Sequence, residues 1–93
     1  MIPDKVKIEG HTYTVNFAKV LLNDGVKGQS CNNGLWITID PALPKQNQES
    51  TFLHELGEQI CDLNDITLEH QTLTTIFRVL YQVLKDNKIT FEG

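Results

Sequence analysis

Apolar and polar side chains alternate through much of the first forty residues. Over residues 5–8 and 12–17 every second side chain is apolar, the period of a strand with one buried face. The Glu9-Gly10 pair between these segments suits a tight turn, so the pattern predicts a β-hairpin. Residues 20–22 are apolar but too few to assign to an element.

A second hairpin is predicted over residues 28–31 and 35–40, where the later segment alternates again. The Asn-Gly pair at 33–34 between them favours a type I′ turn, because both residue types tolerate positive φ angles. Pro41 and Pro44 then close the strand region, since proline cannot donate a hydrogen bond to a sheet.

The second half of the chain has the spacing of α-helices. From about Gln46, an apolar stripe recurs every three or four residues. Its members are Leu53, Leu56, Ile60 and Leu63. Asn64 and Asp65 interrupt this helix, because both residue types prefer caps and turns to helix interiors.

A second helix is predicted to begin after Thr67, which can cap it, and to end at Asp86-Asn87. The side chains expected on its buried side are Leu73, Ile76, Phe77, Leu80, Val83 and Leu84. Residues 1–93 therefore predict one α+β domain, in which a small antiparallel sheet of three or four strands precedes two packed helices.

Composition narrows the classes of function. The formal net charge is −4 and the eight basic residues are scattered, so we expect no nucleic-acid partner. No apolar run approaches the roughly 20 residues that span a bilayer, so we expect no membrane insertion. Residues 1–5 lack the layout of a signal peptide, which predicts a cytoplasmic protein in which Cys31 and Cys61 are free thiols.

The first predicted helix contains a candidate metal site. His54 and Glu58 are four residues apart and therefore project from one face, with Glu55 about a quarter-turn around the helix. This is the layout of an HExxH zinc-protease helix with the second histidine replaced by glutamate. A catalytic zinc commonly takes two histidines and one carboxylate, and His70 can supply the second histidine if the helices pack antiparallel. We therefore predict one Zn²⁺ held by His54, Glu58 and His70, with Glu55 as general base.

Simpler alternatives exist for each of these residues. His54 and Glu58 can be an exposed i, i+4 pair, and Glu55 an ordinary solvated acid. Glu69 is a rival third ligand because it adjoins His70. The remaining acids considered, Glu49, Asp62 and Asp65, are expected to be plain surface residues.

A glycine inside a helix costs about 1 kcal/mol relative to alanine, so Gly57 predicts close approach by another part of the backbone. The strand at 35–39 is the candidate for this approach. An edge strand beside the metal would also allow an extended peptide to bind by strand addition.

At this point the sequence resembles a known family. The segments "TFLHELGEQI", "GQSCNNGLWITID" and "LEHQTLTTIFRVLYQVLKDN" are similar to small proteins of bacteriophages, prophages and integrative elements. Those proteins have a minimal gluzincin-like zinc-metallopeptidase core of a short sheet and two helices. The resemblance covers nearly the whole chain, from "MIPDKVKIEGHTYTV" onward.

The resemblance implies a zinc ligand set and a function. Many relatives carry HExxH with a later glutamate, whereas this chain has HExxE and a later histidine, as a sub-group does. By matching position, the ligands would be His54, Glu58 and His70, and the base Glu55. The expected function is a zinc-dependent hydrolase of metallopeptidase type acting on a peptide or protein. The alternative is an inactive zincin-fold protein that binds a phage or host protein.

Overall fold

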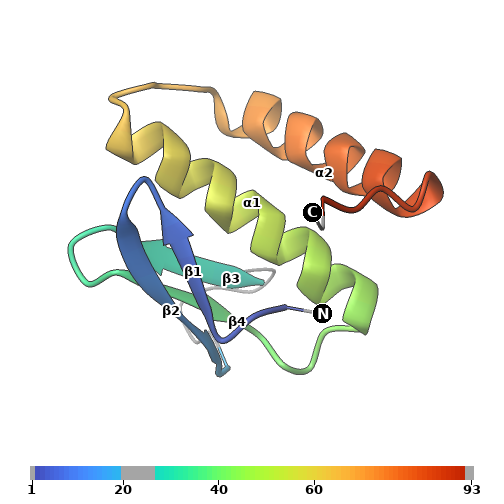
Figure 1. Cartoon of the computed structure of the whole chain (residues 1–93), viewed down its shortest axis with the longest axis horizontal. Coiled ribbons are helices and arrows are strands. Elements are labelled where there is room, and N and C mark those ends of the chain that lie inside the picture. The colour runs from blue at the N-terminus through green and yellow to red at the C-terminus, as the bar shows by residue number, and fades with distance from the viewer. Residues whose placement is uncertain (1, 20–26, 92–93) are drawn as a thin grey trace.

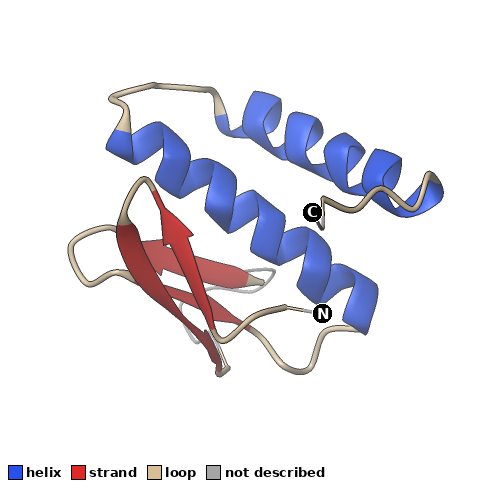
Figure 2. Cartoon of the chain, viewed as in Figure 1, coloured by secondary structure: helices blue, strands red, loops and turns tan. Residues whose placement is uncertain are grey.

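The structure is a computed structural model that describes residues 2–19 and 27–91 of the chain. The elements are β1 (Lys5–Ile8), β2 (His11–Phe17), β3 (Gly28–Cys31), β4 (Trp36–Ile39), α1 (Lys45–Leu63) and α2 (His70–Asp86). Helix α1 lies between the sheet and α2, so the domain has three layers (Figures 1 and 2). The predicted α+β class, a four-stranded sheet followed by two helices, is confirmed. The unassigned segment at 20–22 lies outside the described residues.

The strand order in the sheet is β1-β2-β4-β3. β1 and β2 form the predicted hairpin, and Glu9 and Gly10 have φ angles of 50° and 85°, as a type I′ turn requires. β3 and β4 form the second antiparallel hairpin. β4, however, runs parallel to β2, so the sheet is mixed and not wholly antiparallel as expected. The reason is topological: β3 takes the outer position, and β4 returns between it and β2.

The turn between β3 and β4 differs from its prediction. Neither residue of the Asn-Gly pair at 33–34 has a positive φ angle, and Leu35 has one of 55° instead. The type I′ turn is therefore wrong, and β4 begins one residue later, at Trp36. Gly34 instead leaves room for the Trp36 indole, because a Cβ at position 34 would lie only 2.6 Å from its Cδ1.

The hydrophobic core lies between the sheet and α1. Its buried members are Ile8, Tyr13, Val15, Ile37 and Ile39. Partly buried side chains packed against this cluster include Leu43, Phe52, Leu56 and Leu63. The predicted stripe of α1 thus borders the core only in part, and Ile60 is exposed. The most buried positions of α1 are instead Thr51, Glu55, Gly57, Gln59 and Cys61.

Helix α2 is much more open than predicted. Only Leu73 is buried, whereas Ile76, Leu80 and Val83 are 49%, 40% and 44% exposed. The physical reason is that, among the described residues, α2 packs chiefly on α1, and no further helix or strand covers its outer side (Figure 1). Neither helix in the described part of the chain is long and apolar enough to cross a membrane.

A polar contact joins α1 and α2 near the start of α1. The hydroxyl of Tyr81 donates a 2.6 Å hydrogen bond to Oε1 of Glu49, and Nζ of Lys85 lies 3.5 Å from the same oxygen. Glu49 is therefore no plain surface acid. The hydrogen bond from Tyr81 lowers the pKa of Glu49, while burial and then Glu49 raise the pKa of Tyr81 to about 12.

We expect Tyr81→Phe to lower the free energy of unfolding at pH 7 by about 1–2 kcal/mol, because it removes a hydrogen bond to a charged acceptor. The folded-state pKa of Glu49 lies below the ordinary 4.5, so this stabilisation is present above pH 4.5 and is lost as the pH falls through the folded value. Urea unfolding of both proteins from pH 7 to pH 3 measures the difference. Glu49→Gln should remove the pH dependence of this contact, and an unchanged pH dependence would contradict the assignment.

Candidate metal centre

Helix α1 places His54 and Glu58 on the same face, as their spacing predicts. Nε2 of His54 lies 3.6 Å from Oε1 of Glu58, and both side chains are partly exposed. This face lies beside the surface that α1 presents to the sheet. The pair can therefore be approached from outside the core.

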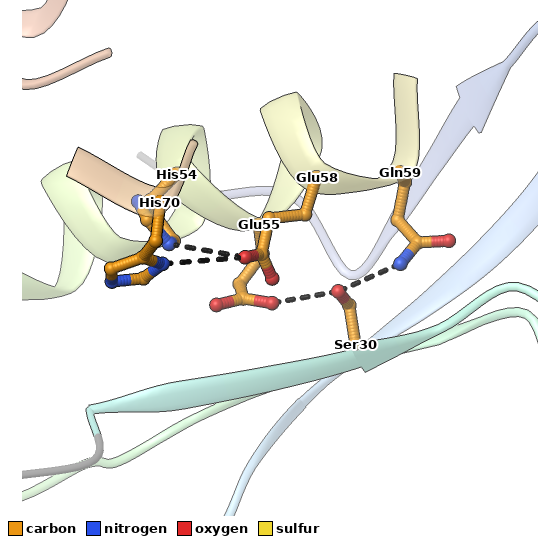
Figure 3. A network of polar contacts seen from close by, with 6 residues as sticks. All are labelled: Ser30, His54, Glu55, Glu58, Gln59 and His70. Atoms are coloured by element: carbon orange, nitrogen blue, oxygen red, sulfur yellow. Dashed lines mark hydrogen bonds and ion pairs between the residues drawn. The ribbon is translucent and has the colours of Figure 1, made fainter. Parts of the chain in front are cut away.

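His70, the first residue of α2, joins this pair because the chain reverses after α1. Helix α1 ends at Leu63, and Asp65 has a φ angle of 52° in the connection. Nδ1 of His70 lies 4.0 Å from Oε1 of Glu58, and the rings of His54 and His70 meet edge to face with centroids 5.3 Å apart. Figure 3 shows both imidazoles directed at the same carboxylate.

The three side chains form a group that can hold a metal ion. His54, Glu58 and His70 each offer one ligand atom, and these atoms all lie within 4.8 Å of one another. Tetrahedral zinc with bonds of 2.0–2.2 Å holds its ligand atoms about 3.4 Å apart, so ligand atoms that lie within 4.8 Å of one another would have to move closer by side-chain adjustment to bind it. Glu69, the rival ligand, occupies the N-cap position of α2 without a side-chain capping hydrogen bond and is not part of this group.

Glu55 lies beneath this group, against the sheet. It is only 5% exposed, and its Oε1 accepts a 2.6 Å hydrogen bond from the hydroxyl of Ser30 on β3. Figure 3 shows this carboxylate between Glu58 and the β3 strand. Glu55 is therefore not an ordinary solvated acid.

A chain of hydrogen bonds continues from Glu55 into the core. Nε2 of Gln59 donates to the Ser30 hydroxyl at 2.8 Å, and the hydroxyl of Tyr13 donates to Oε1 of Gln59 at 2.9 Å. Sequence reasoning did not identify Ser30, Gln59 or Tyr13 as part of the site. One signal was available: Thr51, Glu55 and Gln59 are spaced i, i+4, i+8 and thus form a polar line on one face of α1.

The pKa values of Glu55 and Glu58 are shifted in opposite directions. Burial raises the pKa of Glu55 to about 6, although the hydrogen bond from Ser30 acts in the opposite direction. Interaction with His54 lowers the pKa of Glu58, and the same interaction raises the pKa of His54. Without metal, His54 and Glu58 therefore favour the charged states that attract each other.

Gly57 is needed for close approach, but by a different partner from the one predicted. A Cβ at this position would lie 2.7 Å from Cδ2 and Cζ of the Phe77 ring on α2. The prediction that strand 35–39 approaches Gly57 is wrong. That strand is also internal to the described sheet, and the edge strand nearest the site is β3.

The candidate ligands line a cavity of about 400 Å³ between β3, α1 and α2. Its lining residues are Lys27, Gly28, Ser50, Thr51, His54, Glu55, Glu58, His70, Thr74 and Arg78. The cavity is large enough for part of a peptide and has the predicted ligands and base on its wall.

Comparisons of the chain with protein-family models, curated proteins and solved structures find no match. The chemistry of the site therefore rests on its own residues.

Proposed function

We propose that the protein is a zinc-dependent hydrolase that cleaves peptide bonds, of the gluzincin-like kind that its sequence resembles in phages and mobile elements. The observation that supports this most strongly is the approach of two imidazoles and one carboxylate to within 4.8 Å of one another. The buried carboxylate of Glu55 lies on the wall of the same cavity, where a general base is needed.

Each residue has a distinct role in this proposal. His54, Glu58 and His70 hold the metal. The chemistry that bound zinc supplies is polarisation of the peptide carbonyl and acidification of water. Glu55 takes one proton from the water that attacks the carbonyl carbon and passes it to the departing amine nitrogen, so cleavage of the C–N bond yields a carboxylic acid and an amine; the acid then transfers its proton to the amine, which leaves a carboxylate and an ammonium group. Ser30 fixes Oε1 of Glu55 by its hydrogen bond, which leaves Oε2 to accept that proton.

The outer side of α2 favours a second candidate function. Its exposed apolar residues Ile76, Leu80 and Val83 are spaced i, i+4, i+7 and are the kind of surface that contacts another protein. In that case the chain is an inactive zincin-fold binding module for a phage or host protein, with metal in a structural role.

The test of the proposed function is the zinc content of protein purified without chelators, measured by mass spectrometry. We expect about one zinc per chain, and loss of this zinc in Glu58→Ala and His70→Ala. His11→Ala is the matched control because His11 is exposed on β2, outside the group. Zinc-free wild type, or full zinc in His70→Ala, would overturn the proposal. Full zinc without hydrolysis of any peptide pool would favour the binding module.

A further inference from the structure

Two cations line the same cavity as the candidate metal ligands. Lys27 immediately precedes β3, and Arg78 belongs to α2. They reach the cavity from opposite sides of α1, although the protein has a formal net charge of −4 and few basic residues. Cations at this position favour a ligand with negative charge.

The position of Arg78 relative to the candidate metal centre follows from the helix. His70, Thr74 and Arg78 are spaced i, i+4, i+8, so they line up along one face of α2. Eight residues at 1.5 Å each place the backbone of Arg78 about 12 Å from that of His70. An extended peptide advances about 3.4 Å per residue, so this distance corresponds to about three or four residues of peptide.

Neither of these two cations forms an ion pair with another residue that the structure describes. The ion pairs within residues 2–19 and 27–91 join His54 and His70 to Glu58, and Lys85 to Glu49. Neither Lys27 nor Arg78 takes part in any of them.

A second cavity adjoins the first at Lys27 and Arg78. This cavity of about 300 Å³ shares Lys27, Ser50, Thr51 and Arg78 with the first. It continues to polar residues near the start of α1 and the middle of α2, namely Gln46, Asn47, Tyr81 and Gln82. The cations therefore lie midway along a groove, a position that suits an acidic side chain within a longer peptide.

We propose that Lys27 and Arg78 form a carboxylate-binding subsite that selects peptides with an acidic residue about three or four positions from the bond to be cleaved. This inference rests on the proposed function, which defines that bond. Arginine can bind a carboxylate with two parallel hydrogen bonds, and lysine adds a second positive charge. Lys27 and Arg78 thus determine specificity, whereas Glu55 and the metal ligands perform the reaction.

Equilibrium binding of fluorescein-labelled peptides tests this subsite without relying on turnover. The protein is the Glu55→Gln variant, which holds the peptide uncleaved, with and without added zinc. A neutral heptapeptide is compared with peptides that carry a single glutamate or glutamine at each position. Free and amidated C-termini separate a side-chain carboxylate from a terminal one.

We expect at least one glutamate peptide to bind about tenfold more tightly than its glutamine counterpart. Arg78→Gln should remove most of this preference, Lys27→Gln part of it, and 300 mM salt should weaken it. Lys7→Gln is the control, because it removes the same charge from an exposed position on β1.

Three results would overturn the subsite: equal binding of all glutamate and glutamine pairs, no binding of any peptide at 1 mM, or a preference unchanged in Arg78→Gln. A requirement for a free C-terminus alone would assign the cations to a terminal carboxylate instead. The two proposals fail separately. Zinc binding without a glutamate preference overturns only the subsite, and a glutamate preference in a protein that binds no zinc overturns only the hydrolase.

Discussion

Replacement of Glu55 by glutamine is expected to reduce peptide hydrolysis by about two to four orders of magnitude, the usual contribution of a general base. The amide is nearly the same size as the carboxylate, and its carbonyl oxygen can still accept the hydrogen bond from Ser30. The fold and the metal ligands should therefore be preserved. We expect the zinc content to equal that of the wild type while kcat falls.

The measurement is kcat and zinc content on the same preparations, with hydrolysis followed on a quenched fluorescent peptide. Glu69→Gln is the control, since Glu69 adjoins His70 but lies outside the group of candidate ligands. It should retain both zinc and activity. If Glu55→Gln hydrolyses peptides at the wild-type rate, Glu55 is not the base and the water must be activated by another group.

Local sequence relationships predicted most of the candidate site. The i, i+4 spacing of His54 and Glu58 determines that they share a face of a helix, wherever the helix lies in the fold. The approach of His70 required one more step, antiparallel packing of the helices across Asn64-Asp65, which the prediction took as a condition and the structure shows. Zinc itself stays a prediction.

The parts that the sequence did not predict depend on contacts between distant segments. Whether β4 pairs parallel with β2 depends on which strand takes the outer position, and the alternation of side chains is the same in either case. The contact between Glu49 and Tyr81 joins residues 32 positions apart. Ile76, Leu80 and Val83 have the spacing of a buried face, yet they are exposed in the described part of the chain.

The spacing between α1 and α2 is the feature that links fold and site. His54 and Glu58 belong to α1 and His70 belongs to α2, so the helix spacing sets the distance between the ligand atoms. The ring of Phe77, seven residues after His70 on α2, lies against Gly57 in the space that a side chain at position 57 would occupy. A side chain at position 57 would therefore displace α2 and, with it, His70.

Gly57→Leu is accordingly expected to destabilise the protein by about 3 kcal/mol, the upper end of the usual cost of overpacking, and to weaken zinc binding at the same time. The leucine would occupy the space of the Phe77 ring and force α2, with His70, away from α1. Gly57→Ala should have a smaller effect, because the higher helix propensity of alanine, about 1 kcal/mol, offsets part of the clash. Urea unfolding and zinc titration of the three proteins measure both effects.

The double variant Gly57→Leu/Phe77→Ala separates overpacking from other causes. Removing the ring makes room for the leucine, so the double variant should be more stable than Gly57→Leu and should recover zinc affinity. Phe77→Ala alone should lose stability, because the ring is half-buried and leaves a cavity. If the second substitution gives no recovery, Gly57 does not set the spacing of the helices. If the single variant loses stability but binds zinc as tightly as the wild type, His70 does not depend on that spacing.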